Sequence, residues 1–159
     1  MWLGILVAAI AIGIGLLIGI PRAKEIKRLQ SEGKIIRRAA NYAEKGEEFT
    51  ARIGSFAALK QQLEQAAIPC AMEGNAGSQV NFRGSAFAAR LYVKAFDQPS
   101  GIGIFRFEFT KWKTGSYGYE EDNRMNQLMT AVETAFLTLD PNAGVTAYDL
   151  DFKTKHSFL

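Results

Sequence analysis

The sequence predicts an α+β fold, in which a mainly antiparallel sheet carries two helices on one face. Three observations support this prediction. Within residues 47–159, several segments alternate apolar and polar side chains, two segments repeat apolar side chains at helical spacing, and Gly- or Pro-containing turns separate them. The predicted order is β-α-β-β-β-β-α-β. Because each amphipathic helix must bury an apolar stripe, we expect both helices to cover the same face of the sheet.

An unbroken apolar stretch precedes this domain. Residues 2–20 (WLGILVAAIAIGIGLLIGI) carry no charged side chain. A helix of this length spans about 30 Å, the thickness of the hydrocarbon core of a bilayer, so we expect one transmembrane helix within residues 1–20. A cleaved secretory signal is the alternative. It is disfavoured because nothing basic precedes the stretch and because the stretch exceeds the core of about 7–15 residues that such signals use.

Charge divides the chain into two parts. Residues 1–46 hold eight Lys/Arg against three Glu, a net charge of +5. Residues 47–159, the head, hold eleven Lys/Arg against thirteen Asp/Glu, a net charge of −2, and the two values sum to the +3 of the whole chain. Since basic residues beside a crossing helix stay on the cytoplasmic side, we expect the N-terminus outside and the head in the cytoplasm.

Residues 21–46 are predicted to form a basic juxtamembrane stalk. Its apolar residues recur at helical spacing, with an interruption at Gly33. Two interpretations remain open: an amphipathic helix whose cations reach lipid phosphates on the inner leaflet, or a stalk helix, broken or bent at Gly33, that packs on the head or on a neighbouring chain. The side chains expected at the membrane surface are Arg22, Lys24, Lys27, Arg28, Arg37 and Arg38.

The apolar helix also carries a face of small residues. Ala11, Gly15 and Gly19 lie four residues apart, so they share one side of a helix and would let a second helix approach closely. Small residues are common in membrane helices, and the other interpretation is that these three have no role in helix association. The expected partners are therefore membrane lipid, and either a protein partner or a second copy of the chain.

The first half of the head is predicted to form a strand, a helix and a hairpin. Residues 47–53 alternate as a strand does, and Ser55 is placed to cap a helix over residues 56–66. Pro69 ends that helix. Residues 70–73 and 79–83 then pair around a Gly-rich turn.

The second half contains the clearest strand of the chain. Residues 103–112 place Phe105, Phe107 and Phe109 at period two, so we expect this row to be buried and to form, with residues 87–96, the middle of the sheet.

A helix and a last strand complete the predicted order. Apolar residues recur at helical spacing from Met125 to Leu139, and residues 145–153 form the final strand. No sequence repeat accompanies these elements.

The second face of the predicted sheet is the main candidate for binding. It is either open or covered by the stalk. A mixture of cations and aromatic residues resembles a single-strand nucleic-acid surface, but the negative head would repel phosphates at long range, so nucleic acid is not an expected partner. The residues of this candidate face are Arg83, Arg90, Tyr92, Lys94, Arg106 and Glu108.

A Gly-rich segment after the Phe row is a candidate recognition loop. It presents Trp112, Tyr117 and Tyr119 beside an acidic run, residues 120–122. Aromatic side chains on a loop are typical of protein-binding surfaces. The alternative is that they fold onto the helix that follows.

Few residues suit catalysis. Asp149 and Asp151 share a face of the last strand and, with Glu108, form the one carboxylate set that could hold a divalent metal or transfer protons. Cross-strand pairs with Lys or Arg are the simpler interpretation. His156 lies in a polar tail and Cys70 in an apolar setting. We therefore expect a non-catalytic binding module without a cofactor, and a membrane-tethered metal-dependent enzyme is the second interpretation.

Overall fold

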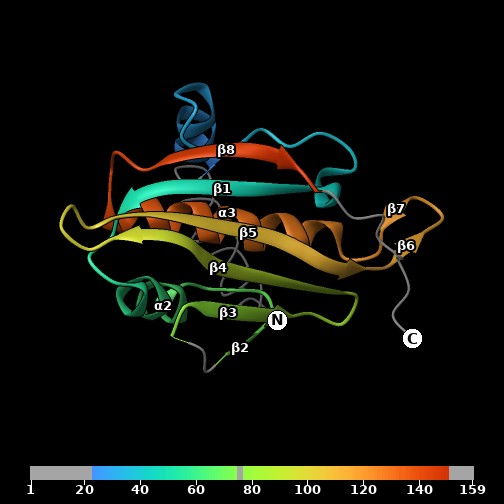
Figure 1. Ribbon diagram of the computed structural model, residues 1–159. Helices are drawn as coiled ribbons and strands as arrows, with labels where there is room; N and C mark the ends of the chain where they lie inside the picture. The colour runs from blue at the N-terminus through green and yellow to red at the C-terminus, as the bar shows by residue number, and fades with distance from the viewer. Residues whose placement is uncertain (1–22, 75–76, 151–159) are drawn as a thin grey trace, which may run out of the picture.

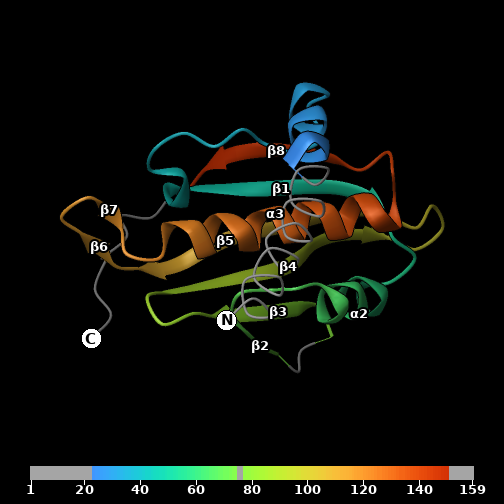
Figure 2. The ribbon, with the colours of Figure 1, turned by 180° about the vertical axis from the view of Figure 1, so that it is seen from behind.

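The computed structural model describes residues 23–74 and 77–150. They form a six-stranded sheet with helices packed on one side, and every neighbouring pair of strands is antiparallel (Figures 1 and 2). The α+β class and the mainly antiparallel sheet are thereby confirmed. The predicted transmembrane helix falls within residues 1–20, outside this range. Among the residues that are described, no helix combines the length and the apolar character needed to cross a membrane.

The elements follow the predicted order, with a short 3-10 helix and a small hairpin added. A helical segment over residues 23–31 precedes them. The strands of the main sheet lie in the order β2-β3-β4-β5-β1-β8. The bounds are η1 (Tyr42–Glu44), β1 (Lys45–Arg52), α2 (Phe56–Gln65), β2 (Ala71–Glu73), β3 (Gln79–Arg83), β4 (Phe87–Asp97), β5 (Ile102–Trp112), β6 (Thr114–Gly115), β7 (Gly118–Tyr119), α3 (Asp122–Leu139) and β8 (Gly144–Asp149).

The core lies between the sheet and the two helices. The side chains of Phe105, Phe107 and Phe109 are completely buried, which confirms the predicted row. From α3, Phe136 stacks on Phe49 of β1 with ring centroids 4.3 Å apart. The Ser55 side chain accepts a hydrogen bond from the first turn of α2 and so caps that helix. The two helices thus cover one face, as their apolar stripes require (Figure 2).

The stalk is helical only in its first part. The helix over residues 23–31 is closed by a turn at Gly33, whose φ of +70° favours glycine and is common just after the end of a helix. The break predicted at Gly33 is therefore confirmed. Residues beyond it run without regular structure to η1, and the Ile36 N–H donates to Glu133 Oε1 of α3 at 2.7 Å. The described stalk therefore packs on the head after its break.

One irregularity in the sheet places several side chains. The register of β4 and β5 shifts between Ala88 and Ala89, where two residues of β5, Thr110 and Lys111, lie opposite Ala88. An extra residue in one strand of an antiparallel pair is a β-bulge, and it changes which way the following side chains point. Because of it, Trp112 returns to the core face although it lies three residues after Phe109.

Candidate binding face

The sheet face turned away from α2 and α3 is the candidate site. Figure 1 views the sheet from this side, with α3 behind it, and no described helix crosses in front. The helical segment over residues 23–31 lies beside the β8 edge in both views, so the described part of the stalk does not cover the face. The face is therefore open over the described residues, and the structure brings the six predicted side chains onto it.

Glu108 is the centre of the first group of charges on this face. Its side chain is buried, with a residue exposure of 4 %, and Oε1 accepts a hydrogen bond of 2.6 Å from Arg90 Nε. Oε2 accepts a hydrogen bond of 2.9 Å from the hydroxyl of Tyr148 on β8. Burial raises the pKa of Tyr148, and the bond to Glu108 raises it further, so this hydroxyl keeps its proton.

A glycine makes this bond possible. Gly46 of β1 pairs with Tyr148, and the tyrosine ring passes directly over it toward Glu108 on the far side of β1. A Cβ atom at position 46 would lie 2.3 Å from Tyr148 Cζ, which is far inside contact distance. The polar network thus requires that position 46 has no side chain. The alternation of apolar and polar residues in β1 does not predict this requirement.

Glu48 is the centre of the second group. Its Oε2 accepts hydrogen bonds from Lys94 Nζ at 2.9 Å and from Arg106 Nε at 2.8 Å. These two hydrogen bonds lower the pKa of Glu48 and keep it ionised. The Arg106 guanidinium also lies over the ring of Tyr148, 4.4 Å from its centroid, and this contact links the two groups.

Together the two groups form a fixed, weakly cationic surface. Three cations face two carboxylates, so the net charge is +1, although the head as a whole is negative. Arg90 lies over the ring of Tyr92 at 5.0 Å, so the second predicted tyrosine is also part of the surface. Hydrogen bonds and aromatic contacts hold the long side chains in place, which lowers the conformational entropy that a partner would have to remove.

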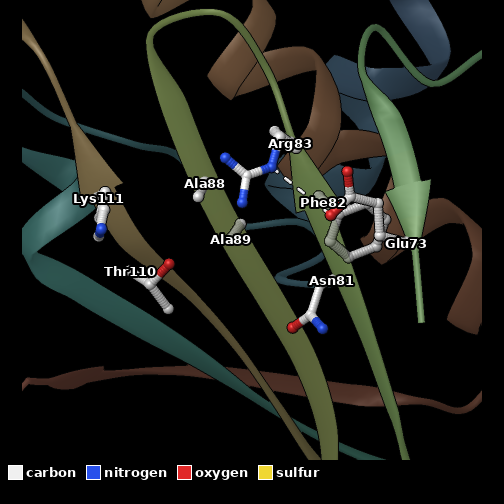
Figure 3. A pocket seen from close by; sticks show the side chains of 8 residues that line it. All are labelled: Glu73, Asn81, Phe82, Arg83, Ala88, Ala89, Thr110 and Lys111. Atoms are coloured by element: carbon white, nitrogen blue, oxygen red, sulfur yellow. Dashed lines mark ion pairs between the residues drawn. The ribbon is translucent and has the colours of Figure 1, made fainter. Parts of the chain in front are cut away.

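Arg83, the sixth predicted residue, lies apart from these groups. It belongs to a hollow of about 280 Å³ near the β2 edge of the same face (Figure 3). Its Nε is 3.5 Å from Glu73 Oε2, and both side chains are mostly exposed. The lining residues are Glu73, Asn81, Phe82, Arg83, Ala88, Ala89, Thr110 and Lys111.

Sequence reasoning missed the β5 side of this hollow. Thr110 and Lys111 are opposite Ala88 only because of the bulge in β5. The indication was present in the sequence: two large aromatic residues, Phe109 and Trp112, lie three residues apart and cannot both face the core of a regular strand. A bulge between them was therefore predictable from the assumption that both are buried.

The residues of the predicted recognition loop differ in exposure. Tyr117 is fully exposed at the tip of the β6–β7 hairpin. Trp112 is completely buried, so its assignment to a recognition surface is wrong. The bulge turns it into the core, where it makes an edge-on contact with Tyr119 at 6.1 Å between ring centroids. Tyr119 in turn packs on Tyr42 and folds back onto the domain.

The prediction that Arg38 lies at the membrane surface is also wrong. Its side chain is only 6 % exposed and lies between two buried carboxylates of the head. It donates to Glu47 Oε1 at 3.1 Å and to Glu133 Oε2 at 2.5 Å. It also donates to Asn126 Oδ1 at 3.0 Å and to Thr130 Oγ1 at 3.2 Å, both on α3. The physical reason is that two inward-facing carboxylates require a cation, and the tertiary structure brings the stalk segment that carries Arg38 beside both of them.

The other cations of the stalk remain at the surface. Lys24, Lys27 and Arg37 are exposed, and Arg28 pairs with Glu25 and Glu32 along its own helix. Their contact with lipid stays a prediction. Several predicted residues lie outside the described ranges, and they are Ala11, Gly15, Gly19, Arg22, Asp151 and His156.

The predicted carboxylate set is not brought together. Asp149 pairs with Lys45, Nζ to Oδ1 at 2.6 Å, on the face of the sheet that carries the helices, whereas Glu108 is on the open face. Neighbouring residues of a strand point to opposite faces, which separates the two. Within residues 23–74 and 77–150, no three His, Cys, Asp or Glu side chains are arranged to hold a metal ion. Burial raises the pKa of Cys70 to about 11, so its thiol is protonated at neutral pH.

Two comparisons with known proteins assign no family to the chain. No protein-family model matches the chain, and no curated protein matches it in sequence. The open face is therefore the feature of the molecule that bears on function.

Proposed function

We propose that this chain is a single-pass membrane protein whose head is a non-catalytic binding module that takes a protein partner on its open sheet face. One observation carries the proposal: a whole face of the sheet has no described element over it, and its cations and tyrosines are held by hydrogen bonds and ring contacts. Arg and Tyr are the residues that most often dominate protein interfaces, and their fixed geometry favours binding.

The membrane part of the proposal depends on the sequence. Residues 2–20 are long and apolar enough to cross a bilayer as a helix. The basic residues follow this stretch directly, which favours a cytoplasmic head with the N-terminus outside. A tethered head meets its partner at a membrane surface, where tethering raises the local concentration of the face.

The test is capture of a partner by the full-length chain from its own membrane, compared between two variants. Lys94→Glu reverses one charge on the open face, and Lys60→Glu makes the same change on α2. The two lysine side chains are matched in exposure, at 41 % and 39 %; Lys94 donates to Glu48 at 2.9 Å, and Lys60 donates to the Gly74 carbonyl at 3.2 Å.

We expect a co-purifying protein to be lost with Lys94→Glu and kept with Lys60→Glu. Equal capture by both variants would show that the open face is not the binding surface. Loss with both would assign the effect to overall charge, and would equally contradict the proposal.

A further inference from the structure

The hollow in Figure 3 differs from the rest of the open face in the pairing of its charges. In the central groups each carboxylate accepts hydrogen bonds from two side chains. In the hollow, among the described residues, the Lys111 ammonium has no carboxylate within ion-pair distance. The one carboxylate that lines it, Glu73, is 3.5 Å from Arg83 in an exposed pair, and such pairs contribute little to stability. The hollow therefore holds two cations that a ligand could engage.

The bulge in β5 is what collects hydrogen-bond donors at this place. In a regular strand Thr110 and Lys111 would point to opposite faces, but here both lie opposite Ala88. The Ala88 side chain is a single methyl group and leaves the space open. Figure 3 shows the Arg83 side chain extending over Ala88 from the other strand, with Asn81 at the lower end of the hollow.

The donors face the space from two strands, β3 and β5, which lie on either side of β4. Arg83 offers a planar guanidinium, Lys111 an ammonium and Thr110 a hydroxyl. Asn81 accepts from Gln79 through Oδ1, which leaves its amide NH₂ available as a further donor. Guanidinium and ammonium groups with a nearby hydroxyl are the combination that binds phosphate oxygens.

We propose that this hollow binds a phosphate monoester, carried as a phosphorylated side chain by the partner of the open face; the identity of that carrier rests on the proposed function. A phosphate monoester has close to two negative charges at neutral pH and three strong acceptor oxygens. Its charges match the two cations of the hollow, and its oxygens can accept from the Thr110 hydroxyl and the Asn81 amide. A carboxylate has one charge and two oxygens, and would leave part of this set without a partner.

The test is a titration of the full-length chain in detergent micelles, followed by the backbone amide NMR signals of Asn81, Thr110 and Lys111. The probes are N-acetyl-O-phosphoserine amide and N-acetylglutamate amide at equal ionic strength. We expect saturable shifts of these signals with the phosphoserine probe and clearly weaker binding of the glutamate probe. Lys111→Gln should weaken binding of the phosphoserine probe about tenfold, the effect of losing one charge-assisted hydrogen bond.

Lys60→Gln is the matched control, because it removes the same charge from α2 on the other side of the sheet, and we expect its affinity to equal that of the unmodified chain. Thr110→Val tests the hydroxyl without a change of charge and should also weaken binding. The inference is overturned by an absence of saturable shifts, by equal weakening in Lys60→Gln, or by equal affinity for the two probes. These outcomes are separate from the Lys94→Glu capture result, so failure of the phosphate site and failure of the proposed function are distinguishable.

Discussion

At the scale of single residues, the polar networks depend on a few positions that the sequence pattern does not single out. Gly46 is important because it lacks a side chain, and Glu47 because it is buried beside another acid. Glu47 and Glu133 share one cation, Arg38, and Glu47 Oε2 is buried without a hydrogen-bond partner among the described residues. Burial raises the pKa of Glu47, with a further contribution from repulsion by Glu133, so the pair favours holding a proton.

Gly46→Ala should destabilise the head by about 2 kcal/mol, since the new methyl group displaces the Tyr148 ring and removes its hydrogen bond to buried Glu108. The measurement is chemical denaturation. Gly144→Ala on neighbouring β8 is the control, because nothing lies within 4 Å of a Cβ there. In a Tyr148→Ala background the Gly46→Ala change should cost little, and an undiminished cost would mean that the ring is not the cause.

The stability of the head should fall as pH rises from about 5 to 8. The unfolded chain releases the Glu47 proton near its ordinary pKa of about 4.3, whereas the folded state retains it to higher pH, so folding is favoured less as pH rises through this window. Below it, Glu48 acts in the opposite sense, because its hydrogen bonds from Lys94 and Arg106 lower its pKa and are lost on protonation.

Urea denaturation across this pH range checks the effect. Glu47→Gln should flatten the pH dependence, whereas Glu64→Gln on the surface of α2 should leave it unchanged. If the free energy of unfolding depends on pH equally in both variants, the proton that the folded state retains is not on Glu47.

At the scale of elements, β5 and the stalk contribute most to the arrangement. β5 buries the Phe row on one face and presents Arg106 and Glu108 on the other, and its bulge creates the hollow near β2. After Gly33 the stalk crosses to the head and inserts Arg38 between β1 and α3. The Ile36 N–H also donates to Glu133 Oε1 at 2.7 Å, so this segment is held at two adjacent points.

Phe107→Ala should reduce the free energy of unfolding by about 3–5 kcal/mol, as truncation of a fully buried aromatic residue leaves a cavity in the core. Denaturant titration measures the change. Ile102→Ala, at an exposed position of the same strand, should cost less than about 1 kcal/mol. A small loss at Phe107 would contradict the register of β5.

Arg38→Ala should cost about 3–5 kcal/mol, because it leaves two buried carboxylates without their cation. It should also increase hydrogen exchange at Ile36, whose N–H bond depends on the same Glu133 side chain. Arg37→Ala is the matched control, since its side chain is exposed and its effect should stay within about 0.5 kcal/mol. Equal effects of the two changes would show that the stalk is not clamped through Arg38.

At the scale of the whole molecule, the sheet divides the head into a buried helical side and an open polar side (Figures 1 and 2). The first and last strands, β1 and β8, are neighbours, and β1 separates β8 from β5. The residues of the open face therefore come from both halves of the chain. A partner bound there would contact strands that are distant in the sequence and become neighbours only when the sheet has folded.

The full-length chain should sediment with membranes after lysis without detergent, because residues 2–20 are expected to cross the bilayer. Protease added outside intact cells should leave the head uncut, since the basic stalk favours a cytoplasmic location. Immunoblotting with an antibody against the head measures both. Digestion of the head would reverse the topology, and recovery in the supernatant would remove the membrane anchor from the proposal.

The sequence by itself determined the order of the elements, the buried Phe row and the division of charge between stalk and head. These are local properties, because the period of apolar residues reports which side of a strand or helix is buried. It also predicted which polar residues share the open face, since alternate positions of a strand point the same way.

Only the tertiary structure decided which of these residues meet. Arg38 and Glu133 lie 95 residues apart in the chain, and their contact depends on how the stalk, β1 and α3 come together. The hydrogen bond from Tyr148 across Gly46 to Glu108 depends on the strand order. The position of Thr110 opposite Ala88 depends on the bulge. Register between distant strands is set by the packing of the whole core, and the local spacing of apolar residues does not determine it.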